Sequence, residues 1–174
     1  MKILAIETSC DETGLALIET DSRNKIKILA NLVSSQIEVH RPYGGVVPNL
    51  AKREHEKALE VLWKELTASR KLTADSPDLI AVTQGPGLAP CLWAGINFAE
   101  NLAKELSVPL AGINHLKGHI YSAFLEKTQK ISKSDFLISK QIQGSKFKIQ
   151  NSDFPILSLI VSGGHTELVY SKKL

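Results

Sequence analysis

The sequence is poor in cysteine and in aromatic residues, and it contains no long apolar run. Cys10 and Cys91 are its only cysteines, and two thiols so far apart indicate neither a disulfide framework nor a cysteine metal site. No segment approaches the roughly 20 apolar residues of a membrane helix, and the N-terminal segment leads into acidic residues instead of a signal-peptide cleavage site. We therefore expect reduced thiols, a cytoplasmic location and no membrane association.

The remaining composition is that of an ordinary globular chain. Of the 174 residues, 43% are hydrophobic and 22% are charged, and the formal net charge is +3. A chain of this length can bury a sizeable core. The small positive charge permits a polyanionic partner without requiring one, so composition names no function.

Apolar periodicity predicts an α/β fold. Strands are expected at 2–6, 14–18, 26–34, 78–82 and 109–113, and helices at 50–70, 88–106 and from 115 to about 126. Asn49 is expected to cap the first helix, after a loop over 40–48, and a tight turn is expected over 84–87. The segment 127–153 is rich in Lys, Ser and Gln and is expected to be an insertion or linker, with a weak strand over 136–142. It is either a solvated excursion or a polyanion-binding arm.

An internal repeat is the most informative pattern. A shift of 153 positions aligns two strand–polar tip–strand segments without a gap, pairing Ile3 with Ile156, Leu4 with Leu157, Ile6 with Leu159, Ser9 with Ser162, Thr13 with Thr166 and Leu15 with Leu168. Related hairpins at the start of each lobe are typical of duplicated two-lobed proteins. Because the second copy stops at Leu174, we expect a first lobe over 1–126, the linker over 127–153, and only the first hairpin of a second lobe over 154–174.

Two turns carry groups suited to binding. The tip from Ser9 to Thr13 offers backbone amides and the carboxylates of Asp11 and Glu12, which can cradle a phosphate or hold a metal-bound water. Gly85–Pro86–Gly87 precedes a helix, whose N-terminal N–H groups can bind an anion. The alternatives are an ordinary polar turn for the first segment and a common glycine-bearing strand-to-helix turn for the second.

His115 and His119 lie four positions apart, so on a helix both imidazoles project from one face and can chelate one metal. Gly118 between them suggests a close approach by backbone or ligand. Two ligands are too few for a stable site, so a third must come from elsewhere. The alternative is a pair of surface histidines. The Glu of the His-Glu-x-x-His protease helix is absent, which counts against proteolysis.

The tip of the second hairpin, 162–166, carries two adjacent glycines that let a ligand approach the backbone closely. His165 could donate to a phosphate or carboxylate there, or act as an acid or base near neutral pH. A simple hairpin turn is the alternative.

Five segments together resemble one family, the tRNA N6-adenosine threonylcarbamoyltransferases (TsaD), formerly called O-sialoglycoprotein endopeptidase or glycoprotease. They are IETSCDET over 6–13, RPYGGVVP over 41–48, GPGL over 85–88, HLKGH over 115–119 and VSGGHT over 161–166. Their order matches the family, and the resemblance covers about the first half of a member. Pro90 and Lys117 depart from the usual pattern, as does the long segment 127–153. Ile160, where archaeal members have a tyrosine ligand, indicates a bacterial or organellar type.

The resemblance implies an actin- and sugar-kinase-like (ribonuclease H-like) α/β lobe of a duplicated architecture. The implied reaction transfers threonylcarbamoyl from threonylcarbamoyl-AMP to N6 of the adenosine 3′ of the anticodon, in tRNAs that read codons beginning with A. The implied cofactor is one Fe2+ or Zn2+ ion, held by His115, His119 and an aspartate of the absent half. The implied partners are tRNA, a non-catalytic paralogue and a small ATPase of the bacterial complex. The sequence does not decide whether the chain forms a dimer.

The resemblance also implies site residues. Asp11 and Glu12 match acidic positions with a part in catalysis, and the substrate-binding stretch is Ile160, Val161, Ser162, Gly163 and Gly164. His165 is a third catalytic candidate because of its own acid–base chemistry. By itself the chain is expected to be an inactive N-terminal fragment. The rival readings are a non-catalytic paralogue, which lacks the two-histidine motif, and a metalloprotease, which the old name suggests. A kinase of the same fold rests on analogy alone.

Overall fold

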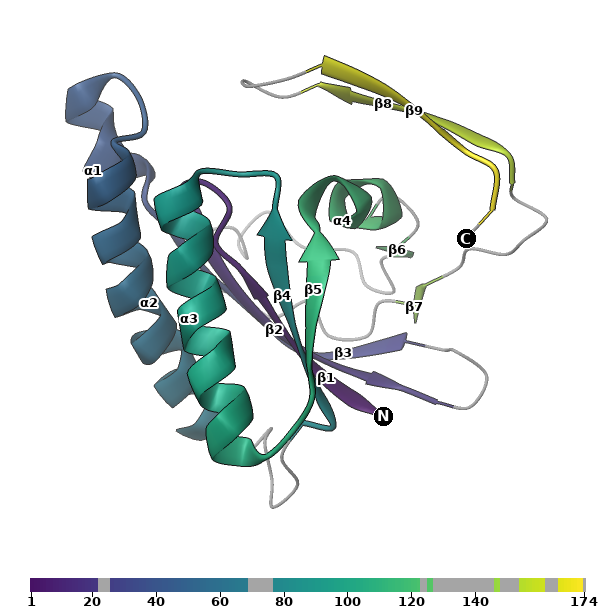
Figure 1. Ribbon diagram of the computed structural model, residues 1–174, viewed down its shortest axis with the longest axis horizontal. Coiled ribbons are helices and arrows are strands. Elements are labelled where there is room, and N and C mark those ends of the chain that lie inside the picture. Colours follow the sequence, from purple (N-terminus) through teal and green to yellow (C-terminus); the bar gives the residue numbers. More distant parts are fainter. Residues whose placement is uncertain are drawn as a thin grey trace, which may run out of the picture.

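A five-stranded mixed sheet forms the centre of the molecule (Figure 1). The computed structural model describes residues 1–21, 26–68, 77–122, 125–126, 146–147, 154–161 and 166–173. The sheet strands are β1 (Lys2–Glu7), β2 (Glu12–Thr20), β3 (Ile26–Ser35), β4 (Leu79–Gly85) and β5 (Leu110–Asn114), in the order β3-β2-β1-β4-β5. β1, β2 and β3 are antiparallel neighbours, whereas β4 lies parallel to β1 and to β5. The carboxyl ends of β1, β4 and β5 therefore meet at one edge of the sheet.

The two long helices cover one face of this sheet (Figure 1). They are α2 (Pro48–Ala68) and α3 (Ala89–Leu106), and α2 follows the short α1 (Ile37–His40) and a 3-10 turn, η1 (Arg41–Tyr43). α4 (His115–Ser122) begins directly after β5. The remaining elements are the strand pair β6 (Leu125–Glu126) and β7 (Lys146–Phe147), and the hairpin of β8 (Ile156–Val161) and β9 (Thr166–Ser171).

The core lies between the sheet and these two helices. Alternate residues of each strand face the helices, as in Leu4 and Ile6 of β1, which are at most 2% exposed. α2 contributes a stripe at helical spacing, Leu59, Leu62 and Leu66, which packs in the same cluster. Full burial of one such side chain contributes about 1.5–3 kcal/mol, so this layer fixes the position of the sheet edge.

The predicted hairpins and helices are present, but several boundaries were wrong. α2 begins at Pro48, because proline is well tolerated in a first helical turn, so Asn49 lies inside the helix instead of capping it. β4 continues through Gln84 to Gly85, where a tight turn was predicted, because it keeps pairing with β5. The helix after β5 ends at Ser122, and Leu125–Glu126 pairs with Lys146–Phe147 as a strand.

Part of the predicted linker lies outside the described residues. This applies to 127–145 and 148–153, and therefore to the weak strand predicted over 136–142. The predicted end of the first long helix at Arg70 also lies outside them.

The second hairpin predicted from the repeat is present. β8 pairs antiparallel with β9, with Leu157 opposite Tyr170 and Leu159 opposite Leu168. All four side chains lie on one face of the hairpin, and each is more than half exposed. The repeat therefore corresponds to two hairpins of the same design, one inside the central sheet and one outside it.

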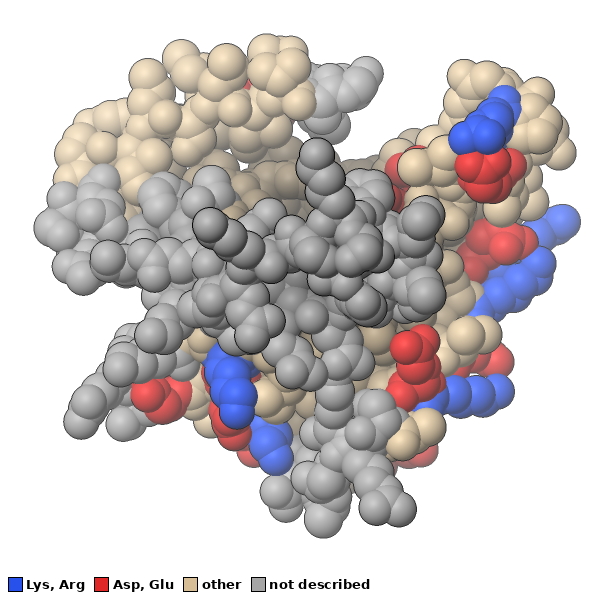
Figure 2. Space-filling model, turned by 180° about the vertical axis from the view of Figure 1, so that it is seen from behind, with Lys and Arg blue, Asp and Glu red and all other residues tan. Residues whose placement is uncertain are grey.

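Charge is distributed unevenly over the surface that Figure 2 shows. Basic and acidic side chains alternate along the edge formed by α1 and α2, where exposed pairs such as Lys52–Glu56 stabilise the helix only slightly. The region of β8 and β9 is almost free of charged side chains in this view. None of the helices in the described part of the chain is both long and apolar enough to cross a membrane.

Alanine substitutions at two helical glycines should change the free energy of unfolding in opposite directions. A Cβ at Gly95 in α3 would collide with the buried side chain of Thr8, whereas a Cβ at Gly118 in α4 would meet no atom within 4 Å. Gly95→Ala should lower the free energy of unfolding by about 1–3 kcal/mol through overpacking. Gly118→Ala should raise it by up to about 1 kcal/mol, because alanine favours the helix. Urea unfolding of both variants tests this, and equal effects would contradict the assigned packing of α3.

Candidate functional site

The turn between β1 and β2, residues 8–11, is held by three different elements. The backbone carbonyls of Ser9, Cys10 and Asp11 in this turn each accept one hydrogen bond. The donors are the Leu88 N–H before α3 at 2.8 Å, the His55 Nε2–H of α2 at 3.0 Å and the Gln36 N–H before α1 at 2.9 Å. Because three consecutive carbonyls are fixed in this way, the backbone that carries Asp11 and Glu12 has a defined position.

α3 approaches this turn very closely. The hydroxyl of Thr8, which is fully buried, donates to the Cys91 carbonyl at 2.9 Å. A Cβ at Gly87 would lie 2.7 Å from the Ser9 carbonyl oxygen, so only glycine fits there. Close packing thus accounts for the glycine turn before α3, and the Leu88 N–H that could have faced an anion is used by Ser9.

His55 connects α2 to both ends of the turn. It is fully buried, and its Nδ1 lies 2.8 Å from the hydroxyl of Thr13. A carbonyl can only accept, so Nε2 carries the proton donated to Cys10 and Nδ1 accepts from Thr13. Burial lowers the pKa of His55, although the carbonyl of Cys10 and the nearby acidic side chains act in the opposite direction. The neutral ring is therefore the stable form in the folded protein.

Glu7, the last residue of β1, is the centre of a second network. Its Oε1 accepts from the Ser9 N–H at 2.6 Å, and its Oε2 accepts from the Thr83 hydroxyl at 2.5 Å. Oε2 also lies 3.3 Å from Nδ1 of His115. Burial alone would raise the pKa of Glu7, but the hydrogen bonds from Ser9 and Thr83 and the neighbouring His115 together lower it. The side chain is an ionised carboxylate at neutral pH.

The two predicted metal ligands converge in space. Asn114 accepts from the Lys117 N–H at 3.1 Å and so caps α4, which begins at His115. One turn later His119 presents its Nε2 at 3.0 Å from Nε2 of His115, with the two rings nearly perpendicular. We call these two residues the histidine pair. A close approach to Gly118 by backbone or ligand was also predicted. A Cβ there would meet no described protein atom within 4 Å, so the described residues supply no such backbone, and approach by a ligand stays a prediction.

The histidine pair fits two of the positions around one metal ion. Two nitrogens bound to a tetrahedral zinc lie roughly 3.3 Å apart, close to the observed separation. Among the described residues, no group of three or more His, Cys, Asp or Glu side chains could hold a metal. The pair alone leaves a site open at two or more positions.

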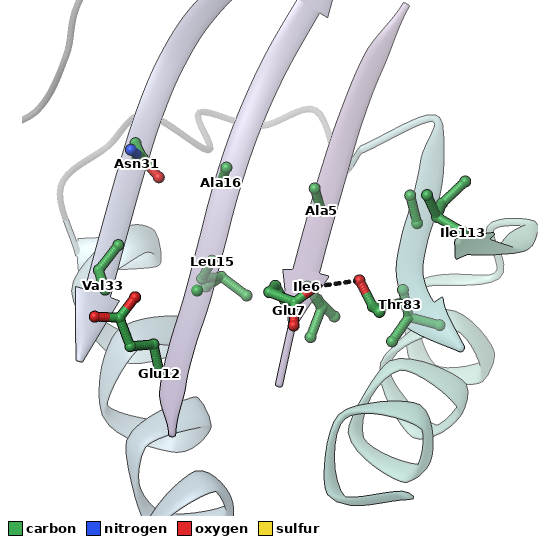
Figure 3. Close-up of a pocket in the computed structure, with 13 residues that line it drawn as sticks. Ala5, Ile6, Glu7, Glu12, Leu15, Ala16, Asn31, Val33, Thr83 and Ile113 are labelled. Atoms are coloured by element: carbon green, nitrogen blue, oxygen red, sulfur yellow. Dashed lines mark hydrogen bonds between the residues drawn. The ribbon is translucent and has the colours of Figure 1, made fainter. Parts of the chain in front are cut away.

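A cleft lies beside these groups, on the sheet face opposite α2 and α3 (Figure 3). We call it the sheet cleft, and its volume is about 320 Å³. Small side chains such as Ala5 and Ala16 line its centre, and Val33 and Ile113 flank it on opposite sides. Glu7 and Glu12 both line it near the end of β1, and Figure 3 shows the bond from Thr83 to Glu7. The sheet cleft thus combines an apolar centre with a carboxylate end.

The structure brings some of the predicted site residues together. Asp11 and Glu12 lie at the same sheet edge as Glu7, and β8, which carries Ile160 and Val161, packs against α4. The predicted residues Ser162, Gly163, Gly164 and His165 lie outside the described residues.

Three residues of the two networks were not predicted from the sequence. Glu7 and Thr83 each directly follow an apolar run, and His55 lies in a charged helix, so local pattern alone does not distinguish them. Glu7 is within the first motif of the resemblance, which was the one signal that could have drawn attention to it. Apart from Ser9, which lies two positions from Glu7, the partners of all three lie more than 40 positions away.

The surroundings of both cysteines disfavour the thiolate, which is the reactive form of the side chain. Both are free, as predicted, with Cys91 buried and Cys10 exposed. Burial, followed by the charge of Asp11, raises the pKa of Cys10 to about 11, and burial also raises the pKa of Cys91. A thiol nucleophile or thiolate ligand is therefore not favoured at this edge.

The comparisons with known proteins point to one family. A family model described as TsaD, tRNA N6-adenosine threonylcarbamoyltransferase, matches residues 27–135. Proteins of that name from Bacillus thuringiensis (strain Al Hakam) and Thermosipho melanesiensis are 43% and 41% identical to this chain. The alignments cover 98% of this chain but 42% and 44% of the two relatives. The chain thus spans less than half the length of the curated relatives it matches.

A solved structure agrees with the fold. YeaZ from Pseudomonas aeruginosa superimposes with a TM-score of 0.50 and 21% identity, covering 71% of this chain and 48% of that chain. Together with the family model, this similarity confirms the predicted actin- and sugar-kinase-like, ribonuclease H-like α/β class.

His55 should stabilise the fold in a pH-dependent way. The pKa of His55 is lower in the folded chain than in the unfolded chain. Below pH 6.5 the unfolded chain therefore takes up a proton that the folded chain does not, and the stability that His55 contributes decreases as the pH is lowered. His55→Gln can keep only one of the two hydrogen bonds and should cost about 1–3 kcal/mol at pH 7.5. The difference from the unsubstituted protein should shrink at pH 5.5. Urea unfolding at both pH values tests this, and a difference that grows at pH 5.5 would contradict the assignment.

Proposed function

This chain belongs to the tRNA N6-adenosine threonylcarbamoyltransferase family, and on that premise we propose that it supplies the metal-binding lobe of a tRNA-modifying acyltransferase. The observation that carries the proposal is the convergence of the histidine pair at the sheet edge that also carries Glu7, Asp11 and Glu12. Family membership supports the reaction, and the geometry supports where its groups lie. The proposed location is the cytoplasm.

In the proposed reaction, the substrate amine is N6 of the adenosine 3′ of the anticodon, in tRNAs that read codons beginning with A. N6 attacks the carbamoyl carbon of threonylcarbamoyl-AMP. The new bond joins N6 to that carbon, and the bond from the carbon to the phosphate oxygen breaks, so that AMP leaves with the electron pair. One proton must leave N6. Of the two acidic residues assigned to catalysis, Glu12 lines the sheet cleft and is solvent-exposed, so it can accept a proton there.

We assign the metal to Nε2 of His115 and Nε2 of His119, with Fe2+ or Zn2+ as the ion. A bound ion of this kind supplies Lewis-acid polarisation of a carbonyl or phosphoryl oxygen. The stretch Ile160 to Gly164 is proposed to contact the adenylate, which agrees with the packing of β8 against α4. His165 is proposed as a further donor or acid at the same hairpin tip.

The proposed organisation is a first lobe over 1–126, a polar segment over 127–153, and the start of a second lobe over 154–174. In duplicated two-lobed folds the ligand lies between the lobes. The metal then requires an oxygen ligand from the second lobe, because the histidine pair offers two nitrogens. The proposed partners are tRNA, a non-catalytic paralogue of similar fold and a small ATPase.

Zinc should bind this chain weakly and through the histidine pair. Two imidazoles without a third protein ligand give incomplete coordination. Replacing both His115 and His119 by alanine should remove the binding seen by calorimetric titration, whereas His40→Ala, in α1, should keep it. Unchanged zinc affinity in the double variant would show that the metal lies elsewhere.

Residues 1–174 alone should not transfer threonylcarbamoyl to tRNA, even when metal and threonylcarbamoyl-AMP are supplied. Without a second lobe the adenylate loses contacts that hold it in its attack geometry, and positioning of this kind supplies roughly 7–11 kcal/mol. The test is transfer of radiolabelled threonine to unmodified tRNA, with a full-length relative as the control. Metal-dependent product from the 174-residue chain would overturn the proposed division of the site.

A further inference from the structure

We propose that Glu7 is the positioning residue of the histidine pair, because it fixes the ring tautomer that turns a bare nitrogen of His115 toward His119. The inference deepens the proposed function and rests on its metal site. It concerns a residue that would not contact the metal, and whose role follows from three hydrogen bonds within this chain.

The carboxylate of Glu7 has only one arrangement available. The backbone N–H of Ser9 cannot turn away from Oε1, and the Thr83 hydroxyl holds Oε2 from the neighbouring strand β4. A carboxylate held at both oxygens cannot rotate about its terminal bond without losing both donors. Glu7 therefore presents Oε2 to His115 in a fixed direction.

This fixed oxygen determines the tautomer of His115. A carboxylate only accepts hydrogen bonds, so the contact at 3.3 Å requires a proton on Nδ1 of His115. In the neutral ring Nε2 then carries a lone pair, and it is this atom that lies 3.0 Å from Nε2 of His119. His119 must then donate its Nε2 proton to His115, and a metal ion held by the two Nε2 atoms would take the place of that proton.

Carboxylates that accept from the far nitrogen of a metal-binding histidine orient the ring and make it a better ligand. Glu7 satisfies this geometry before any metal is present. Thr83 and Ser9 act through Glu7, so β4 and the β1–β2 turn are coupled to α4 through one side chain. We therefore expect His115 to be oriented, with a bare Nε2, for metal binding in the apo protein.

Glu7→Gln gives a directional test. The Ser9 N–H still needs an oxygen, so the amide oxygen should take the place of Oε1 and the amide NH2 the place of Oε2. The Thr83 hydroxyl can rotate to accept, but His115 must then accept at Nδ1 and carry its proton on Nε2. The substitution should therefore reverse the tautomer of His115 and place a proton where the metal would bind.

The readout is the ring nitrogen spectrum of 15N-labelled protein, in which long-range proton couplings distinguish the two tautomers. His115 is assigned from a His115→Gln variant. The expected result is Nδ1–H in the unsubstituted chain and Nε2–H in Glu7→Gln. Glu12→Gln is the matched control, because it removes the same charge from the same cleft, and among the described residues Glu12 shares no hydrogen bond with His115.

Zinc titration followed on the same resonances gives a second readout. Glu7→Gln should weaken zinc binding by about 10–100-fold, and Glu12→Gln should weaken it less than threefold. An Nε2–H tautomer in the unsubstituted chain, or an unchanged tautomer in Glu7→Gln, would overturn the inference. So would an unchanged zinc affinity in Glu7→Gln when zinc does bind the histidine pair. If Glu7→Gln does not fold, the tautomer of His115 in the unsubstituted chain still tests the inference. If the expected tautomers are found but zinc leaves the histidine pair unaffected, the proposed metal site fails and the role of Glu7 in setting the ring tautomer is supported.

Discussion

Three consecutive carbonyl groups, those of Ser9, Cys10 and Asp11, determine how the rest of the site is arranged. Each accepts a hydrogen bond from a different element, and these elements lie far apart in the sequence. A short polar turn would ordinarily be held by its own backbone and by water. Here the turn is fixed by the starts of α1 and α3 and by the middle of α2. The position of the acidic residues therefore depends on the packing of the whole helical layer.

Burial explains why this arrangement needs polar residues at particular places. The close approach of α3 excludes water from Thr8, and the ring of His55 is fully enclosed, so each polar atom must find a partner within the protein. Among the described residues no buried side-chain nitrogen or oxygen lacks such a partner. Thr8, Ser9 and Thr13, which look like parts of a polar turn in the sequence, are thus in the hydrogen-bonded interior, and substitutions there act on stability as well as on chemistry.

The sequence predicted what depends on local pattern. The apolar run from Lys2 to Ile6 predicted β1, and leucines at helical spacing predicted α2, because both segments pack into the core. The i, i+4 spacing likewise placed the histidine pair on one helical face. Glu7 and His55 could not be predicted in the same way, because their roles depend on partners brought close by the order of the strands. The roles of Asp11, Glu12 and the 160–165 stretch remain predictions.

The repeat also explains what the second hairpin requires. Shifting by 153 positions relates Leu4 to Leu157, Ile6 to Leu159, Leu15 to Leu168 and Leu17 to Tyr170. The first member of each pair is at most 2% exposed beneath α2 and α3, whereas the second is between 58% and 66% exposed. The same apolar face is therefore covered in one hairpin and uncovered among the described residues of the other.

Burial of each such side chain contributes about 1.5–3 kcal/mol. The second hairpin would gain this stability when a layer equivalent to α2 and α3 packs on it. That layer would also bring a second set of side chains to the histidine pair, because β8 already packs against α4. Covering of the apolar face of the second hairpin and completion of the proposed metal site are thus expected to occur together.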